Sequence, residues 1–316
     1  MHAAVVNVLG QPPQYQEFPD PVAREGEVAV KVRAAGLHPV VRAIASGAHY
    51  SAGGEVPAVA GIDGVGTLGD GKRVYFGGVR KPWGTMAERA VVASTMYIPL
   101  PDGIDDVQAA AIANPGMSAW VSLKNRAEVT AGETVMILGA TGVAGRLAVQ
   151  TARILGAKRV IGVGRNVEAI AGADVDAVIA LGEPEDAVRE AFATEAAKGI
   201  DVVIDYLWGR PTELLLEALA KGFSASATHP TRLVEVGGSA GSTITLPAAT
   251  LRSVDLTLKG SGFGAAKITE IFAAIPTLFS LAAEGKLTIA AEAVPLAEVE
   301  AAWNRSEKGR RIVFTM

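Results

Sequence analysis

The chain has 316 residues, of which 49% are hydrophobic and 20% charged, and its formal net charge is −4. This length exceeds the roughly 100–200 residues of a typical domain, so we expect two domains of ordinary globular composition. The slight negative charge offers no electrostatic attraction to nucleic acid or to an anionic membrane, and the absence of cysteine excludes disulfides, thiolate metal ligands and a cysteine nucleophile. The N-terminus lacks the pattern of a signal peptide, and no apolar run is long enough to span a bilayer, so we expect a cytoplasmic protein.

The first hundred or so residues have the pattern of an antiparallel β domain. Short alternating runs such as EVAVKVRAAG (27–36) and KRVYFGG (72–78) lie between turn residues. Residues 104–123 then read as helical, and we expect proline to interrupt this helix at Asn114–Pro115.

From residue 132 the pattern changes to alternating strands and helices. Continuous apolar runs indicate buried strands at 133–139, 159–164, 175–181, 200–207 and 231–238, with helical segments between them. This alternation predicts a parallel sheet with right-handed crossovers. The helix after Asn166 has room for only about two turns. A long amphipathic helix is expected at about 266–284, and GRRIVFTM (309–316) is expected to return as a strand to the first domain.

Residues 139–145, GATGVAG, join the first of these strands to the first helix. Such a glycine turn lets the backbone approach a pyrophosphate closely, and the helix N-terminus adds amide donors and a partial positive charge. The dinucleotide fingerprint has three glycines, and its positions here hold Ala140, Gly142 and Gly145. The alternative is an ordinary glycine turn in an α/β domain. The candidate cofactor contacts are Ala140, Thr141, Gly142, Val143, Ala144 and Gly145.

The next strand ends in VIGVGRN (160–166). In NAD-binding units an acid about 20 residues beyond the fingerprint binds the ribose 2′-hydroxyl, and here that place is taken by Arg165. A guanidinium can bind a 2′-phosphate in a forked geometry, so we predict NADPH rather than NADH. Gly164 would leave room for the adenosine, and Asn166 would add a hydrogen bond. The alternative is that Arg165 is merely a solvated residue at the end of a strand.

The chain resembles the medium-chain dehydrogenase/reductase superfamily, most of all its zinc-free quinone oxidoreductase branch. The resemblance rests on the order and spacing of VKVRAAGLHPVVRAIASGAHY, GIDGVG, GTMAERAVV, GATGVAGRLAVQTARILGA, DVVIDYLWG and RLVEVGGSAG. It implies an α/β protein with a GroES-like, mainly antiparallel β domain (1–114 and 267–316) and a doubly wound Rossmann domain (115–266). It also implies a cleft between the domains and a homodimer.

Zinc-dependent members of this superfamily have a cysteine ligand at the position of His38, a His–Glu pair at Ile62–Asp63, and a third ligand near Asn114. Only His38 is a good zinc ligand here, and a catalytic site needs three, so we expect no metal. Simple ketones benefit from a Lewis acid, whereas quinones and enones accept hydride at carbon and need only hydrogen-bond donors at the oxygen.

The same resemblance suggests the remaining site residues. The candidate catalytic residues are Tyr50, His49 and His38, and Tyr50 and His49 compete for one position because this loop has one extra residue. For each, the alternative is a loop or packing role. Asp63 is expected to serve a turn rather than acid–base chemistry. The candidate substrate contacts are Asn114, which would otherwise cap the next helix, and Trp83, which would otherwise pack. Leu207, Gly237, Gly238 and Phe263 follow strands and are placed beside the nicotinamide.

The sequence therefore predicts an NADPH-dependent reductase that transfers hydride to a small quinone or α,β-unsaturated carbonyl. One alternative is an enoyl-thioester reductase, although no basic cluster for a coenzyme A phosphate is evident. Another is a protein that binds NADPH as a sensor or structural component without turnover.

Overall fold

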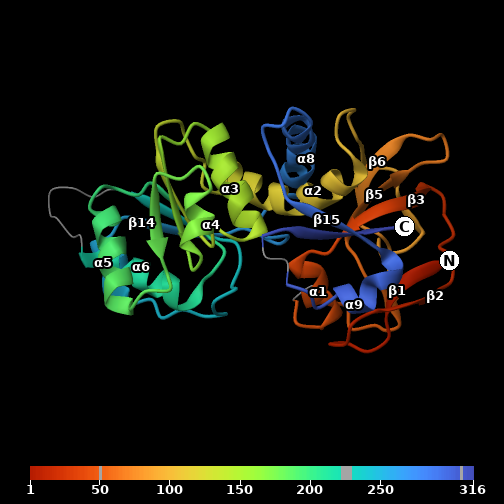
Figure 1. Cartoon of the computed structure of the whole chain (residues 1–316), viewed down its shortest axis with the longest axis horizontal. Helices are drawn as coiled ribbons and strands as arrows, with labels where there is room; N and C mark the ends of the chain where they lie inside the picture. The colour runs from red at the N-terminus through yellow and green to blue at the C-terminus, as the bar shows by residue number, and fades with distance from the viewer. Residues whose placement is uncertain (50–51, 222–229, 307–308) are drawn as a thin grey trace. The chain divides into compact units, whose positions relative to one another are not determined.

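The computed structural model describes residues 1–49, 52–221, 230–306 and 309–316. Its contacts divide the chain into two compact units (Figure 1). Unit 1 consists of Met1–Pro115 and Ile275–Met316, and unit 2 of Gly116–Ala274. We expected the second junction at 266/267, and it falls later, inside the long helix α8 (Ile268–Ala283). The reason is that Ile271 and Ala274 of this helix pack with Val121 of unit 2.

Unit 1 is built on two sheets of mainly antiparallel strands. The smaller has the order β2-β1-β4, and the larger β15-β16-β3-β5-β6-β8, with β7 also paired to β3. The strands are β1 (His2–Val6), β2 (Gln14–Glu17), β3 (Glu27–Gly36), β4 (Ala58–Val59), β5 (Asp63–Thr67), β6 (Arg73–Gly77), β7 (Arg89–Ala93), β8 (Tyr97–Pro99), β15 (Ala291–Pro295) and β16 (Arg311–Thr315). The short helices are α1 (Pro39–Ala45) and α9 (Val299–Ala302), with a 3-10 turn, η2 (Leu296–Glu298), before α9.

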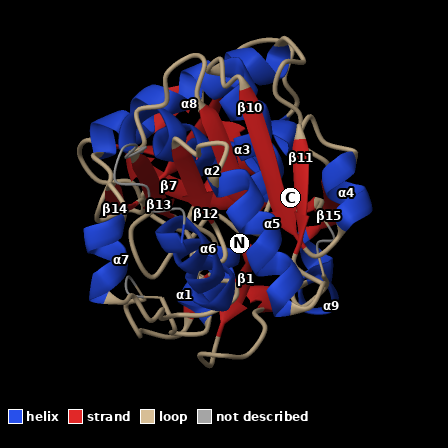
Figure 2. Cartoon of the chain, turned by 90° about the vertical axis from the view of Figure 1, so that its left-hand side faces the viewer, coloured by secondary structure: helices blue, strands red, loops and turns tan. Residues whose placement is uncertain are grey.

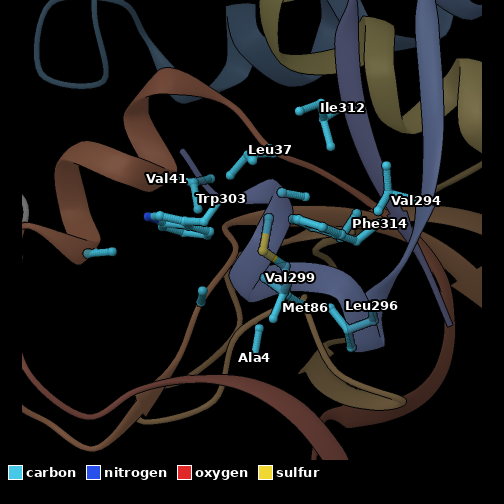
Figure 3. Packing of buried hydrophobic residues seen from close by; sticks show 14 of the residues in the cluster. Ala4, Leu37, Val41, Met86, Val294, Leu296, Val299, Trp303, Ile312 and Phe314 are labelled. Carbon is cyan, nitrogen blue, oxygen red and sulfur yellow. The ribbon is translucent and has the colours of Figure 1, made fainter. Parts of the chain in front are cut away.

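The core of unit 1 joins residues from both ends of the chain. Leu37 and Met86 from the first part pack with Trp303 and Phe314 from the last (Figure 3). The expected return of the C-terminal strand is confirmed, because β16 pairs antiparallel with β3, with Phe314 opposite Ala35.

The helix α2 (Asp106–Val121) runs without interruption and continues into a π-helical turn, η1 (Ser122–Arg126). The expected break at Asn114–Pro115 is therefore wrong. Proline removes one backbone donor from a helix interior. Here the helix is nonetheless held by burial, because Ala109, Ala110, Ala111, Ile112 and Ala113 are all almost completely buried.

Unit 2 contains the predicted parallel sheet, with the strand order β11-β10-β9-β12-β13-β14. The strands are β9 (Thr134–Leu138), β10 (Arg159–Gly164), β11 (Ala177–Ala180), β12 (Val202–Asp205), β13 (Thr231–Glu235) and β14 (Leu256–Gly260). The chain winds outward from β9 to β11 and then crosses to β12, so the strand order reverses between β9 and β12. Ligands of such sheets bind at the carboxyl ends of the strands, at this switch point.

The helices of unit 2 are α3 (Val143–Ile154), α4 (Val167–Ala171), α5 (Glu185–Ala196), α6 (Gly209–Lys221) and α7 (Ala248–Ser253) (Figure 2). The expected helix after Asn166 is α4, and at five residues it is as short as predicted. Val143, Leu147 and Thr151 form the buried face of α3, as their helical spacing indicates. Within the described residues, no helix has both the length and the apolar character needed to cross a membrane.

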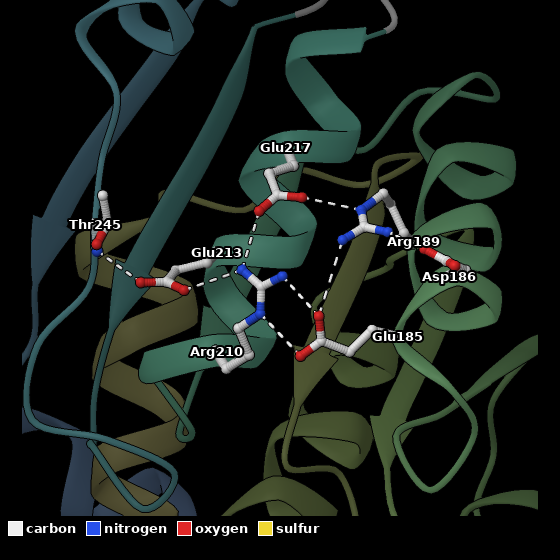
Figure 4. Close-up of polar contacts among 7 residues, drawn as sticks. All are labelled: Glu185, Asp186, Arg189, Arg210, Glu213, Glu217 and Thr245. Atoms are coloured by element: carbon white, nitrogen blue, oxygen red, sulfur yellow. Dashed lines mark hydrogen bonds and ion pairs between the residues drawn. The ribbon is translucent and has the colours of Figure 1, made fainter.

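A network of charged side chains joins α5 to α6 (Figure 4). Arg210 of α6 binds Glu185 of α5 and also Glu213 and Glu217 of its own helix. Arg189 of α5 reaches back to Glu217 at 3.0 Å. Glu213 also accepts a hydrogen bond from the backbone N–H of Thr245 at 2.7 Å, so the network fixes the loop before α7 as well as the two helices.

Candidate cofactor and active site

The turn from β9 to α3 has the backbone geometry that a dinucleotide requires. Gly139 has a φ of 89°, a backbone conformation that residues with a side chain rarely adopt. A Cβ on Gly145 would lie 2.1 Å from the carbonyl oxygen of Gly139, so only glycine allows this close packing of helix and strand. Ala140 occupies the first fingerprint position and is fully buried. Its methyl group fits because the residue opposite it, Gly162, has no side chain.

The N-terminus of α3 is open to an anion. Gly142 is the N-cap residue, so no side chain caps the helix, and its first turn contains no acid. The first amides of a helix have no partners within the helix, and they carry partial positive charge. The Arg146 Nε donates to the carbonyl oxygen of Thr141 at 3.2 Å and so braces the turn. These features fit a pyrophosphate.

Arg165 is exposed directly after β10, and its side chain makes no ion pair with any residue in the described part of the chain. Gly164 lies beside Thr141, because a Cβ there would be 3.5 Å from the Thr141 hydroxyl oxygen. The Oδ1 of Asn166 accepts a hydrogen bond from the Ala169 N–H at 3.0 Å and caps α4. Its Nδ2 remains as the donor for the hydrogen bond that we predicted.

The other predicted cofactor residues follow β12, β13 and β14, at the carboxyl edge of the same sheet. Leu207 lies against the glycine turn, since a Cβ on Gly139 would be 3.2 Å from its Cδ2. The N–H of Gly237 donates to the carbonyl oxygen of Asp205 at 3.2 Å. Gly238 has no room for a side chain, and Phe263, beyond β14, is 48% exposed. Their contacts with a cofactor remain predictions.

In unit 1, His38 is the N-cap residue of α1 and is fully buried. Its Nε2 lies 3.2 Å from Oδ1 of Asp63, without the geometry of a hydrogen bond. The other oxygen of Asp63 accepts a hydrogen bond from the Tyr75 hydroxyl at 2.8 Å. Burial, and then the negative charge of Asp63, raise the pKa of Tyr75 well above its usual value, so this hydroxyl stays a donor. Asp63 therefore does more than serve a turn: it accepts the hydrogen bond of the partly buried Tyr75 and lies beside the buried ring of His38.

Comparison with known proteins shows which enzymes the chain is similar to. No family model matches the chain. It is 29% identical, over 99% of both chains, to a protein of Emericella nidulans described as a "Probable NADPH-dependent quinone reductase". It is 30% identical to human quinone oxidoreductase over 63% of this chain, and it spans 60% of that relative. The crystal structure of the quinone oxidoreductase from Thermus thermophilus, also solved with NADPH, matches over the whole of both chains at 28% identity and a TM-score of 0.82.

The chain is therefore similar over its whole length to quinone oxidoreductases of the medium-chain dehydrogenase/reductase superfamily. The resemblance inferred from the sequence is thereby confirmed, as is the pairing of a GroES-like domain with a Rossmann domain. In Rossmann domains generally, a glycine turn after the first strand and a reversal of strand order, both present in unit 2, place a dinucleotide.

The remaining catalytic candidates lie in the segment after α1. Tyr50 falls outside the described residues. His49 is half-buried, and its N–H donates to the carbonyl oxygen of Ala43 at 3.1 Å, which folds the segment back on α1. The choice between His49 and Tyr50 stays a prediction.

The two substrate candidates have well-defined surroundings. The Nε1 of Trp83 donates to the carbonyl oxygen of Pro19 at 2.9 Å, and the guanidinium of Arg80 lies 4.8 Å from the centre of its ring. These contacts favour the packing alternative for Trp83. Asn114 lies inside α2, so the alternative that it caps a following helix is wrong. Contact of either residue with substrate stays a prediction.

Sequence reasoning missed one residue of this site, Asp205. It is fully buried at the end of β12, and burial raises the pKa of its carboxyl group, although three hydrogen bonds partly oppose this. A signal was available in DYLWGRPT (205–212), where an acid closes an apolar run just before a turn into a helix.

Proposed function

We propose that this protein reduces quinones or α,β-unsaturated carbonyl compounds with NADPH, by direct hydride transfer and without a metal ion. One arrangement carries the proposal. The glycine turn leads into an α3 N-terminus that no side chain caps, and nearby Arg165 is exposed and forms no ion pair with an acidic residue in the described part of the chain. The amides of α3 would hold the pyrophosphate, and Arg165 with the Nδ2 of Asn166 would hold the 2′-phosphate. The similarity to NADPH-dependent quinone reductases supports the same cofactor and substrate class.

NADPH, when bound, supplies the hydride. The chain's task is to fix the cofactor, to orient the substrate and to return a proton to the substrate oxygen. We assign the proton donor to the phenolic hydroxyl of Tyr50 or to the ring of His49. His38 is the third candidate, but its full burial against Asp63 favours a packing role.

Metal independence is supported by the chemistry of the available donors. The chain has no cysteine. Across the residues that the structure describes, no three His, Asp or Glu side chains are grouped so that they could hold a metal ion. A conjugated acceptor spreads negative charge onto its oxygen, where hydrogen-bond donors can stabilise it in place of a Lewis acid.

The protein is further proposed to be a cytoplasmic homodimer that binds no nucleic acid. Among the described strands β14 pairs only with β13, so it forms an edge of the parallel sheet. Leu258 on this strand is 39% exposed and Leu251 of α7 is 52% exposed. An unpaired edge strand can pair with its copy around a two-fold axis. Light scattering coupled to gel filtration would report a monomer if this part of the proposal is wrong.

The decisive assay follows NADPH oxidation by the purified protein after treatment with a chelator. A simple quinone and a simple enone are tested in parallel, each also with NADH. We expect turnover with a preference for NADPH, and the better acceptor identifies the substrate class. Loss of turnover on chelation, restored by zinc, would refute metal independence. Tight NADPH binding without turnover of either acceptor would favour the sensor alternative or an enoyl-thioester substrate.

A further inference from the structure

Asp205 closes the turn between β12 and α6. Its Oδ1 accepts hydrogen bonds from the N–H groups of Leu207 at 2.8 Å and Trp208 at 2.9 Å, and its Oδ2 accepts one from the Thr212 hydroxyl. The carboxylate therefore fixes the backbone on both sides of the turn. Since the side chain is fully buried, water cannot replace these hydrogen bonds.

This turn has an unusual backbone that needs such support. The backbone φ angles of Trp208 and Gly209 are 55° and 61°. Residues other than glycine rarely adopt this left-handed region. The turn directs Leu207 onto Gly139, the first residue of the glycine turn. Asp205 thus determines where Leu207 lies relative to the segment that would hold the pyrophosphate.

The backbone carbonyl of Asp205, independently of its side chain, holds the segment after β13. It accepts hydrogen bonds from the N–H groups of Val236 at 2.8 Å and Gly237 at 3.2 Å. The Ala240 N–H in turn donates to the carbonyl oxygen of Leu207 at 2.7 Å. A Cβ on Gly209 would lie 2.8 Å from the Ala240 carbonyl oxygen, so the two segments are in close backbone contact.

The two segments lie on the side of the sheet that the nicotinamide half of a dinucleotide would occupy. The pyrophosphate belongs at the N-terminus of α3, after β9, and the adenosine half extends toward Arg165, after β10. Because β12 lies on the other side of β9 from β10, the opposite half of the cofactor runs over the ends of β12 and β13. Leu207 and Gly237 follow these two strands.

We propose that Asp205 is a positioning residue for the nicotinamide half of NADPH, its carboxylate acting through Leu207 and the segment bonded to the Leu207 carbonyl, without touching the cofactor. This inference rests on the proposed NADPH-binding function. It predicts a selective effect: loss of the carboxylate weakens contacts to the nicotinamide half and spares those to the adenosine half. A merely structural role would weaken both halves together.

The experiment is calorimetric titration of the full-length protein with NADPH and, separately, with 2′,5′-ADP, which lacks the nicotinamide half. For Asp205→Ala we expect the Kd of NADPH to rise about tenfold, while that of 2′,5′-ADP changes less than about twofold. Asp205→Asn keeps an acceptor for both amides and should restore NADPH affinity to within about threefold of wild type. Asp174→Ala removes an exposed carboxylate elsewhere in unit 2 and is the matched control.

Parallel weakening of both ligands, or an unchanged NADPH affinity, would overturn the inference. If Asp205→Ala does not fold, as judged by circular dichroism, Thr212→Val removes one of the three hydrogen bonds and carries the same test. It should weaken NADPH about threefold and leave 2′,5′-ADP unchanged, and no selective effect would again refute the role of Asp205. Wild-type protein that binds neither ligand would overturn the proposed function itself and this inference with it.

Discussion

Replacing Gly145 by alanine tests whether the contact between α3 and β9 is as tight as the structure indicates. The added Cβ would lie 2.1 Å from the carbonyl oxygen of Gly139 and 2.8 Å from the Cα of Ala140. Both are backbone atoms, so no side chain can rotate away. Cβ atoms in proteins essentially never lie closer than 3.0 Å to such an atom. The first turn of α3 must therefore shift outward by nearly 1 Å.

Two opposing terms set the size of the effect. Overpacking a well-packed site costs about 1–3 kcal/mol. Alanine has a higher helix propensity than glycine, which returns up to about 1 kcal/mol. We therefore expect a net loss of about 1–2 kcal/mol, which for a unit of this size lowers the melting temperature by roughly 2–8 °C.

Thermal unfolding followed by circular dichroism measures this change, with Gly260→Ala as the control. No heavy atom lies within 4 Å of a Cβ at Gly260, which is in β14 of the same unit. That variant should be at least as stable as wild type, because alanine restricts the unfolded chain. If Gly145→Ala melts no lower than Gly260→Ala, the reasoning about the turn is refuted.

Three other changes have definite expected outcomes. Arg165→Glu should invert the NADPH/NADH ratio of kcat/KM, since a carboxylate repels a 2′-phosphate and accepts from a ribose hydroxyl; an unchanged ratio would disprove the assignment. Tyr75→Phe leaves an oxygen of buried Asp63 without its donor and should cost about 1–3 kcal/mol in denaturant unfolding, whereas Tyr97→Phe, at a partly buried tyrosine in β8, should cost much less. Burial raises the pKa of Asp205 in the folded state, so protonation of this carboxyl group stabilises the fold. This stabilisation is lost as the pH rises through the folded-state pKa. Wild type should therefore lose stability relative to Asp205→Asn as the pH increases from about 3.8, the ordinary value, and parallel stability profiles would contradict this.

Local sequence patterns were sufficient for the features that depend on neighbouring residues. The glycine turn, the short helix after Asn166 and the alternating elements of unit 2 all follow from spacing within a few residues. The break expected at Pro115 was wrong because the burial of α2 outweighs the lost hydrogen bond, and burial depends on distant parts of the chain.

The polar contacts of the candidate site were harder to foresee. His38 meets Asp63 only because β3 and β5 pair across an antiparallel sheet, and no local pattern connects the two residues. Asp205 is different, since its side-chain partners lie within seven residues. Its role was readable as an aspartate that closes a turn, but its link to Gly237 required the pairing of β12 with β13.

Unit 1 is built from two segments that are far apart in the sequence. This affects the order in which the two units can fold during synthesis. Unit 2 is one continuous segment and can complete its fold once residue 274 has emerged from the ribosome. Unit 1 must wait, because β3 acquires its partner β16 only after residues 311–315 are made. Until then its core lacks Trp303 and Phe314, and the Ala34–Gly36 end of one edge of β3 has no partner strand. Unit 1, whose first strands are made before unit 2, is thus finished after it.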